Sequence, residues 1–171
     1  MKYLPWSKVS DWYCKTCGKC CKVFKVPLSF IEVKLLLKRF GSYCIEASTG
    51  VFYLKRINGR CIFQFSNLCS IHPFKPIACK LWPFSIHEIP KYGEKNHAYF
   101  EYRGQVFYVY LNSYCEGIIP GKPSFRLVNK IIPELIDLTQ KPYLLYNNWT
   151  KTFPRVFNFN IYFQNKLYSK M

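Results

Sequence analysis

Four of the nine cysteines fall within eight residues, in the run C-x2-C-x2-C-C from Cys14 to Cys21. A cysteine two residues away from the next lets the chain turn once and aim both sulfurs at one ion, as in the knuckles of thiolate metal sites. Gly18 suits such a turn because glycine accepts a positive φ angle. Cys20 and Cys21 are adjacent, so we expect their side chains to diverge. The run therefore predicts thiolate metal ligation, at more than one centre or at one centre beside a separate thiol.

A disulfide framework and a set of inert buried thiols are the other uses of such cysteines. The opening segment MKYLPWSKVSDWYCK contains no apolar core of a signal peptide, and nine cysteines are an odd number for oxidative pairing. No apolar run approaches the roughly 18 residues of a membrane span. We therefore expect a protein of the reducing cytoplasm, where clustered cysteines act as metal ligands.

The chain of 171 residues is strongly basic, with 25 Lys and Arg against 9 Asp and Glu and a formal charge of +16. Eight metal-bound thiolates and two divalent ions would still leave about +12. This sign favours an acidic protein, an anionic ligand or nucleic acid as a partner. Lysines outnumber arginines 19 to 6, however, and a lysine-rich composition alone accounts for the charge, because base-reading surfaces depend mainly on arginine.

Two predicted helices stand close to the cysteines in sequence. Ser29 and Glu32 form an S-x-x-E capping box, apolar residues follow at helical spacing, and Gly41 suits the C-cap. Pro76 fits the first turn of a second, short helix over 77–81. That short helix would carry Cys79 towards a site formed with the N-terminal run.

Two hairpins are also predicted. The first joins strands over 51–55 and 61–65 through Asn58-Gly59, a hairpin-turn signal. The second joins 99–102 and 106–111, where aromatic and β-branched residues alternate around Arg103-Gly104-Gln105.

A last helix is expected from Ser124 to about Leu138, with Pro133 either as a kink or as the start of its more regular part. The expected fold is a small α+β domain with short antiparallel strands and two or three helices, joined by the cysteine metal sites. Residues 1–120 would form the metal-binding region. Residues 121–171, a helix and a basic aromatic tail, would pack on the same domain.

The motifs form an ordered set along the chain. In sequence order they are Cys14-x2-Cys17-Gly18-x-Cys20-Cys21, Cys61-Ile62-Phe63, Cys69-x-Ile71-His72-x2-Lys75-Pro76-x2-Cys79-Lys80-x-Trp82-Pro83-Phe84 and Cys115-x-Gly117. This set resembles the YkgJ-type CxxCxxCC cysteine-cluster family, over roughly residues 12–120. Members are described as zinc- or iron-chelating domains, and flagellin lysine-N-methylases carry a similar domain. The chain differs from the family at Lys75 and Lys80, where the family usually has arginine.

The resemblance implies eight metal ligands, a number that suits two four-thiolate centres. They are Cys14, Cys17, Cys20, Cys21, Cys61, Cys69, Cys79 and Cys115. Cys44 has no motif partner and is expected to be a spare buried thiol. His72 has ligand spacing from Cys69, but the family tolerates an aromatic residue there, so a packed or supporting histidine is expected. His87 and His97 are isolated in the sequence.

Closed tetrathiolate sites accept zinc or iron. The C-x2-C-x2-C run favours an iron–sulfur cluster of the 4Fe–4S type, held by three nearby cysteines and one remote residue, over Zn²⁺. We expect a metal-binding protein linked to electron or group transfer. Likeness to the flagellin enzymes implies methylation of lysine with S-adenosylmethionine, but no glycine-rich nucleotide loop is legible, so enzymatic activity stays open. The alternatives are a zinc-stabilised basic module that binds nucleic acid and a structural metalloprotein that presents a surface to a partner.

Overall fold

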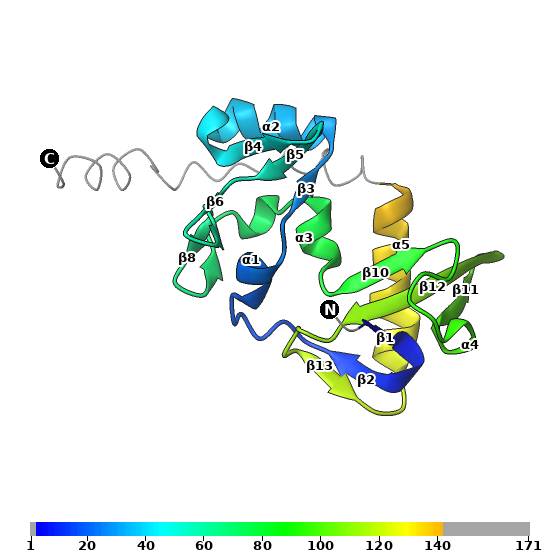
Figure 1. The fold of residues 1–171 in the computed structure, drawn as a ribbon. Coiled ribbons are helices and arrows are strands. Elements are labelled where there is room, and N and C mark those ends of the chain that lie inside the picture. The colour runs from blue at the N-terminus through cyan, green and yellow to red at the C-terminus, as the bar shows by residue number, and fades with distance from the viewer. Residues whose placement is uncertain (1–2, 142–171) are drawn as a thin grey trace, which may run out of the picture.

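The computed structural model describes residues 3–141, and its fold is of the predicted α+β class. Figure 1 shows two halves, one around strand β12 and one around helix α2. Each half has its own cluster of buried apolar side chains. None of the helices in residues 3–141 is long and apolar enough to cross a membrane.

The first half is built on β12 (Gln105–Asn112), an eight-residue strand whose Val109, Tyr110 and Leu111 are fully buried. On one side β12 pairs with β10 (Phe84–His87). On its other side it pairs with β11 (Tyr99–Tyr102) and β1 (Tyr3–Pro5). The predicted hairpin over 99–111 is confirmed, with Arg103 and Gly104 at positive φ in its turn.

A helix covers this sheet. Ser124 Oγ accepts the Leu127 N–H at 3.1 Å, as expected of a cap, and the helix continues as a π-helical segment η4 (Leu127–Ile131) and then as α5 (Ile132–Gln140). Pro133 has no N–H to close the preceding α-helical turn, and the chain widens into the π form just before it. Buried residues of η4 and α5 belong to the same apolar cluster as β12. The predicted tail beyond residue 141 lies outside the described residues.

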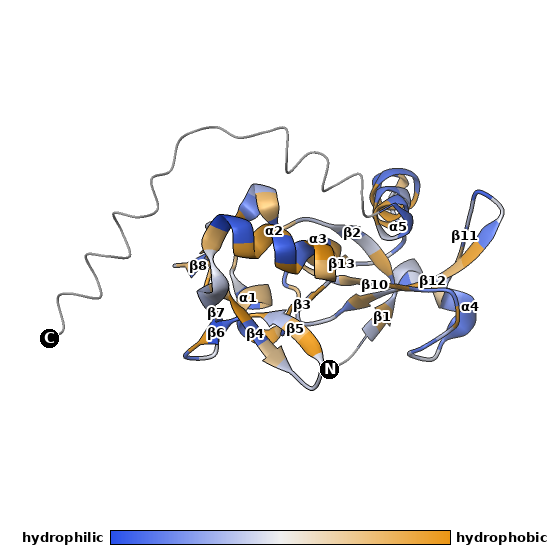
Figure 2. Ribbon diagram, turned by 90° about the horizontal axis from the view of Figure 1, so that it is seen from above, coloured by the Kyte–Doolittle hydropathy of each residue, from blue (hydrophilic) through white to orange (hydrophobic). Residues whose placement is uncertain are grey.

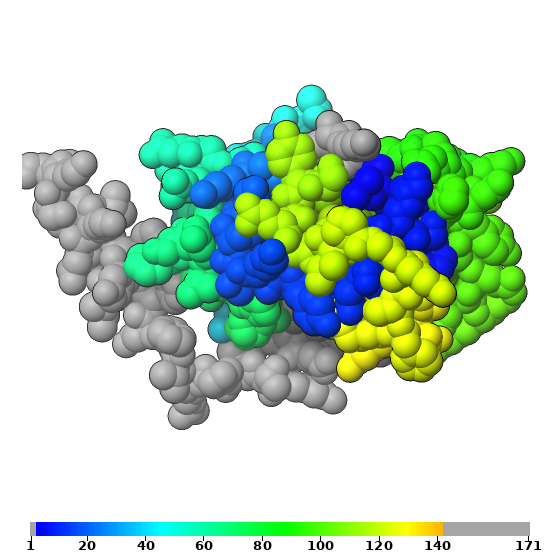
Figure 3. Space-filling view, turned by 90° about the horizontal axis from the view of Figure 1, so that it is seen from below, coloured from blue at the N-terminus to red at the C-terminus, as the bar shows by residue number. Residues whose placement is uncertain are grey.

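A separate two-stranded ribbon leads into the cysteines. It pairs β2 (Val9–Trp12) with β13 (Ile118–Pro120), and a short 3₁₀ turn η1 (Trp6–Lys8) precedes it. Figure 3 shows these two segments side by side, blue against yellow-green. Cys14 follows the first strand and Cys115 precedes the second, so the ribbon brings the two cysteines to the same end.

The second half is built on α2 (Phe30–Phe40) and a sheet of order β3-β5-β4 (Pro27–Leu28, Val51–Leu54, Ile45–Ser48), with a 3₁₀ turn η2 (Ser42–Cys44) after the helix. The predicted capping box is present, since Ser29 Oγ accepts the Glu32 N–H and Glu32 accepts the Ser29 N–H at 2.8 Å. Figure 2 shows hydrophilic and hydrophobic residues alternating around α2, and its apolar face buries Val33 and Leu36 in the second cluster.

The strand pairing predicted for 51–65 is only half right. Asn58 and Gly59 do form a turn, but it joins the two-residue strands β6 (Arg56–Ile57) and β7 (Arg60–Cys61). β5 pairs instead with β4, through a turn at Thr49-Gly50 that has the same positive φ angles. The phenylalanine and tyrosine of β5 therefore pair with β4, which precedes them in the chain, and not with a strand that follows Asn58-Gly59.

Several short elements lie around the cysteines and carry four of the nine. They are α1 (Lys19–Val23), the hairpin of β8 (Gln64–Phe65) with β9 (Leu68–Cys69), a 3₁₀ turn η3 (His72–Phe74), and α3 (Ile77–Leu81). α3 spans the predicted residues. α1 and the one-turn α4 (Lys95–Ala98) were not predicted, which makes five α-helices in residues 3–141 where the sequence indicated two or three.

Candidate metal centre

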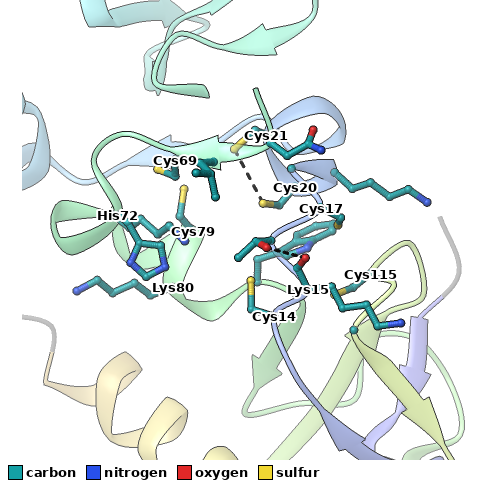
Figure 4. Close-up of a pocket in the computed structure, with 18 of the residues that line it drawn as sticks. Cys14, Lys15, Cys17, Cys20, Cys21, Cys69, His72, Cys79, Lys80 and Cys115 are labelled. Atoms are coloured by element: carbon teal, nitrogen blue, oxygen red, sulfur yellow. Dashed lines mark hydrogen bonds between the residues drawn. The ribbon is translucent and has the colours of Figure 1, made fainter. Parts of the chain in front are cut away.

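The eight predicted ligands meet between the two halves of the fold. A cavity of about 540 Å³ is lined by seven of them, Cys14, Cys17, Cys20, Cys21, Cys69, Cys79 and Cys115. The eighth, Cys61, lines a much smaller enclosed space of about 30 Å³ together with Cys20, Cys21, Cys69 and Cys79. The thiols therefore form an inner group of five and an outer group of three, as Figure 4 shows for the seven around the larger cavity.

The inner group consists of Cys20, Cys21, Cys61, Cys69 and Cys79. The thiols of Cys21 and Cys61 are hydrogen-bonded, and Cys69 and Cys79 act electrostatically on Cys61. Cys21, Cys61, Cys69 and Cys79 also pack in the second apolar cluster, with Val26, Leu54 and Ile71. These cysteines are therefore part of the core of the α2 half as well as candidate ligands.

Cys20 and Cys21 do not diverge as the sequence predicted. Their Sγ atoms lie 4.0 Å apart, close to the roughly 3.8 Å between two thiolates on one tetrahedral zinc ion. The reason is local, because both residues lie on α1, where successive side chains are about 100° apart rather than on opposite faces as in a strand. Cys20 lines both the small inner space and the large cavity, as do Cys21, Cys69 and Cys79.

The outer group consists of Cys14, Cys17 and Cys115. Cys14 and Cys17 both act electrostatically on the Cys115 thiol. Trp12 Nε1 donates a hydrogen bond to Cys115 Sγ at 3.3 Å, and Lys19 lies near Cys17 and Cys115. The outer thiols are more open than the inner ones, and Cys14 is exposed.

Backbone N–H groups donate to several of the sulfurs. The sulfurs of Cys61, Cys69 and Cys115 each accept a hydrogen bond from the backbone of the residue two positions later, namely Phe63, Ile71 and Gly117. Such bonds stabilise the thiolate form and orient a ligand before metal arrives. The Cys-x-Phe, Cys-x-Ile and Cys-x-Gly motifs seen in the sequence are thus turns that hold a sulfur.

Two glycines let these turns approach the rest of the chain. Gly18 has a φ of +70°, and a Cβ there would lie 2.5 Å from Gln64 Nε2 and 3.1 Å from the backbone of Asn67. A Cβ on Gly117 would lie 1.9 Å from the carbonyl oxygen of Tyr13. The Tyr13 N–H donates to Gly117 O at 3.0 Å, so this close approach fixes Cys14 beside Cys115.

Glu32 positions Cys79, a role that the sequence did not reveal. This carboxylate is only 3% exposed, and besides capping α2 its Oε1 accepts the Ile77 N–H at 2.7 Å. Ile77 is the first residue of α3, the helix that carries Cys79. One buried carboxylate therefore fixes the starts of two helices 45 residues apart in sequence.

Asp11 and Arg126 hold the strand that leads to Cys14. Arg126 donates to both carboxylate oxygens of Asp11, at 3.1 and 2.7 Å, and to Trp12 O at 2.6 Å. Its guanidinium also lies over the ring of Tyr13, 3.9 Å from the centroid. Burial raises the pKa of the Asp11 carboxyl, but Arg126 and the Trp12 N–H outweigh it and hold that pKa below its usual range.

Burial and mutual contact raise the pKa of four of the five inner thiols. Hydrogen bonding to Cys21, followed by burial, raises the pKa of Cys20, and burial raises that of Cys79. The hydrogen bond with Cys20 lowers the pKa of Cys21, but its contact with Cys61, burial and nearby thiolates raise it to about 11. The pKa of Cys61 is lowered, because the Cys21 thiol donates to it. A metal ion binding here must displace protons.

The other candidate residues are placed as follows. Cys44 is fully buried in the second cluster, and its thiol donates to Gly41 O at 3.1 Å. His72 lines the large cavity, and burial, followed by Lys75 and Lys80, lowers its pKa. His87 and His97 do not line this cavity; they contact Ser85 and Ser7 respectively.

The donor set fits zinc or iron. Thiolates are the soft ligands that both zinc and iron–sulfur clusters take, and the backbone and indole N–H donors complete their surroundings. In residues 3–141 no three Cys, His, Asp or Glu side chains stand at the mutual spacing of a closed metal site. The structure thus shows thiols gathered around a cavity rather than a finished coordination sphere.

Comparison with known proteins provides a further line of evidence. The model of the CxxCxxCC family, described as a "putative zinc- or iron-chelating domain", matches residues 13–116. The chain is also 33% identical, over 134 residues, to a protein of Methanocaldococcus jannaschii named "Uncharacterized protein MJ0939". That match covers 73% of this chain but only 43% of the archaeal protein, so the chain spans less than half the length of this relative. No solved structure matches.

Proposed function

This chain belongs to the CxxCxxCC family of zinc- or iron-chelating domains, and we propose that it holds two thiolate metal centres side by side at one cavity. The observation that carries the proposal is the division of the thiols into an inner and an outer group. The eight cysteines come from five separate stretches of the sequence, and they line this cavity and the small space beside it.

The inner centre takes Cys21, Cys61, Cys69 and Cys79. All four pack in the second apolar cluster, and two of them already accept backbone N–H bonds. A closed site of four thiolates suits zinc or iron and leaves no open position for a substrate.

The outer centre takes Cys14, Cys17 and Cys115, with Cys20 as the fourth ligand. Cys20 belongs to the same C-x2-C-x2-C run as Cys14 and Cys17 and, unlike the four inner ligands, does not pack in the second apolar cluster, so turning its side chain away from Cys21 completes the set. Three close cysteines and one remote cysteine are the ligand arrangement of many 4Fe–4S clusters.

An iron–sulfur cluster, when bound, supplies one-electron chemistry. The protein's own part is to hold the sulfurs, to donate N–H bonds to them from Trp12 and Gly117, and to leave one side of the outer group open to the cavity. Hydrogen bonds to cluster sulfurs and solvent exposure are the usual means of setting a reduction potential. These features favour electron transfer as the activity.

Purification without oxygen tests the proposal. We expect iron with acid-labile sulfide at the outer centre, tetrathiolate metal at the inner one, and an absorption spectrum that bleaches on reduction. Cys115→Ser should remove the outer centre alone, whereas Cys44→Ser, a matched change of a buried thiol, should leave the metal content intact. A Cys115→Ser variant that retains all of its metal would contradict the assignment.

The same preparation tests two other functions. Calorimetric titration with S-adenosylmethionine, followed by mass measurement of candidate lysine substrates, tests methyl transfer. Salt-sensitive binding of an RNA or DNA oligonucleotide tests the nucleic-acid function that the positive charge suggests. Binding of either would displace electron transfer as the leading activity, whereas redox cycling without either would support it.

A further inference from the structure

The walls of the large cavity are positively charged. Lys15, Lys19, Lys75 and Lys80 line it together with His72, and none of its lining residues in the described part of the chain is an aspartate or glutamate. Thiols, Thr16 and Asn67 add further polar groups to its surface. A cavity with several cations and no carboxylate attracts negatively charged ligands.

The lysines on one side already have a counter-charge. Lys19 forms an ion pair with Glu116 at 2.5 Å, and Lys15 also acts on that carboxylate. Lys19 also lies near the sulfurs of Cys17 and Cys115. This pair of lysines therefore serves the outer thiols and Glu116.

The lysines on the other side are not paired in this way. Neither Lys75 nor Lys80 forms an ion pair within residues 3–141. The carboxylate that acts on Lys80 is Glu32, whose oxygens accept bonds from Ser29 and from the Ile77 N–H. Both lysines lie near His72, but Lys75 also lies near the inner thiols Cys20, Cys69 and Cys79, whereas Lys80 lies at the edge of the site (Figure 4).

The cavity also has an apolar surface. Trp12 and Trp82 line it together with Leu68 and Pro73. Its volume of about 540 Å³, part of which the outer centre would take, lies inside the range of small-molecule sites, roughly 300–1,000 Å³. A ligand with an anionic group and an apolar or aromatic body would use both kinds of wall.

We propose that this cavity binds a small organic anion, whose carboxylate or phosphate contacts Lys75 and Lys80 while its body lies against the tryptophans. The anion then sits over the thiol groups, next to the outer centre. This inference rests on the proposed metal-binding function only for the presence of metal beside the ligand. The lysine and tryptophan side chains that line the cavity do not depend on bound metal.

Calorimetric titration of the zinc-loaded full chain tests the site. The probes are inorganic phosphate, for the phosphate chemistry, and phenylacetate, for a carboxylate with an aromatic body. We expect millimolar or tighter binding of at least one probe, weakening as salt is added. Lys80→Gln should weaken it about tenfold, the factor that 1.4 kcal/mol represents. Lys80→Arg should retain it.

Three controls make the outcome decisive. Lys38→Gln changes an exposed lysine of α2 that does not line the cavity, and its binding should equal that of the unchanged protein. Lys75→Gln should weaken both probe binding and metal retention, because Lys75 serves the thiols as well. Melting curves and zinc content, measured on every variant, show that each is folded and loaded.

The results separate this inference from the proposed function. Zinc-loaded protein that binds neither probe, or Lys80→Gln and Lys38→Gln with equal affinities, would overturn the anion site and leave metal binding untouched. A chain that retains no metal but still binds a probe through Lys80 would overturn the metal centres and support the anion site.

Discussion

Replacing Gly117 by alanine should dismantle the outer centre. The new Cβ would lie 1.9 Å from Tyr13 O and 3.0 Å from Tyr13 C, where a carbon–oxygen contact needs about 3.3 Å. One strand must therefore retreat by about 1.4 Å, which breaks the 3.0 Å bond from the Tyr13 N–H to Gly117 O. Cys14 follows Tyr13 directly and Cys115 stands two residues before Gly117, so the retreat separates the outer thiols.

The cost can be worked from these contacts. Overpacking costs about 1–3 kcal/mol and the lost backbone hydrogen bond about 1 kcal/mol, so Gly117→Ala should lose about 2–4 kcal/mol of unfolding free energy. For a chain of this size that lowers Tm by about 5–15 °C. The variant should lose the metal of the outer centre and retain that of the inner centre.

Gly104→Ala provides the matched control. Gly104 has a φ of +73° but nothing within 4 Å of a built Cβ, so alanine there suffers only the backbone strain of about 1 kcal/mol. Scanning calorimetry and metal analysis of both variants decide the matter. Equal melting temperatures and equal metal content would refute the close-approach argument.

Three further predictions concern the cysteines and the half-buried ion pair of Asp11 with Arg126. Cys21→Ser should remove the inner centre and Cys20→Ser the outer one, as metal stoichiometry will show; identical loss from both would mean a single shared centre. Strong chelation should lower Tm sharply, and an unchanged melt after verified metal loss would mean that the thiols are not structural ligands. Because the folded-state pKa of Asp11 is depressed, its contribution to stability is present above the unfolded pKa of about 4 and lost as the pH falls through the folded value. Asp11→Asn should therefore be less stable than the unchanged chain near pH 7, and the difference in Tm should shrink below about pH 4; a gap independent of pH would contradict the role of the charge.

Local signals in the sequence predicted the local structure well. The capping box at Ser29 and Glu32, the helix over 77–81 and the turn at Arg103-Gly104 all depend on residues within a few positions of each other. The sequence therefore contains the physical cause of each. The wrong prediction that the side chains of Cys20 and Cys21 diverge also had a local cause. Both residues lie on α1, which was not predicted, and successive side chains are about 100° apart in a helix but on opposite faces in a strand.

Contacts between residues far apart in the sequence could not be predicted from such local signals. Glu32 meets Ile77 across 45 residues and Arg126 meets Asp11 across 115. The capping box predicts the contact of Glu32 with Ser29 but not the one with Ile77, and nothing near Arg126 distinguishes it from an ordinary surface charge, because the distant partner is supplied by the tertiary fold. The same holds for β12, whose neighbours β1 and β10 come from distant parts of the chain.

The two groups of thiols differ in how they are tied to the fold. Four of the five inner cysteines pack in the apolar cluster of the α2 half, so their metal would add to a core that already exists. Outer cysteines stand on the loops of the β2–β13 ribbon, which belongs to the β12 half. The adjacent residues Cys20 and Cys21 connect the groups across the seam between the halves. Metal at both centres would therefore fix one half against the other, and the cavity with its lysine walls would keep its shape only while that link holds.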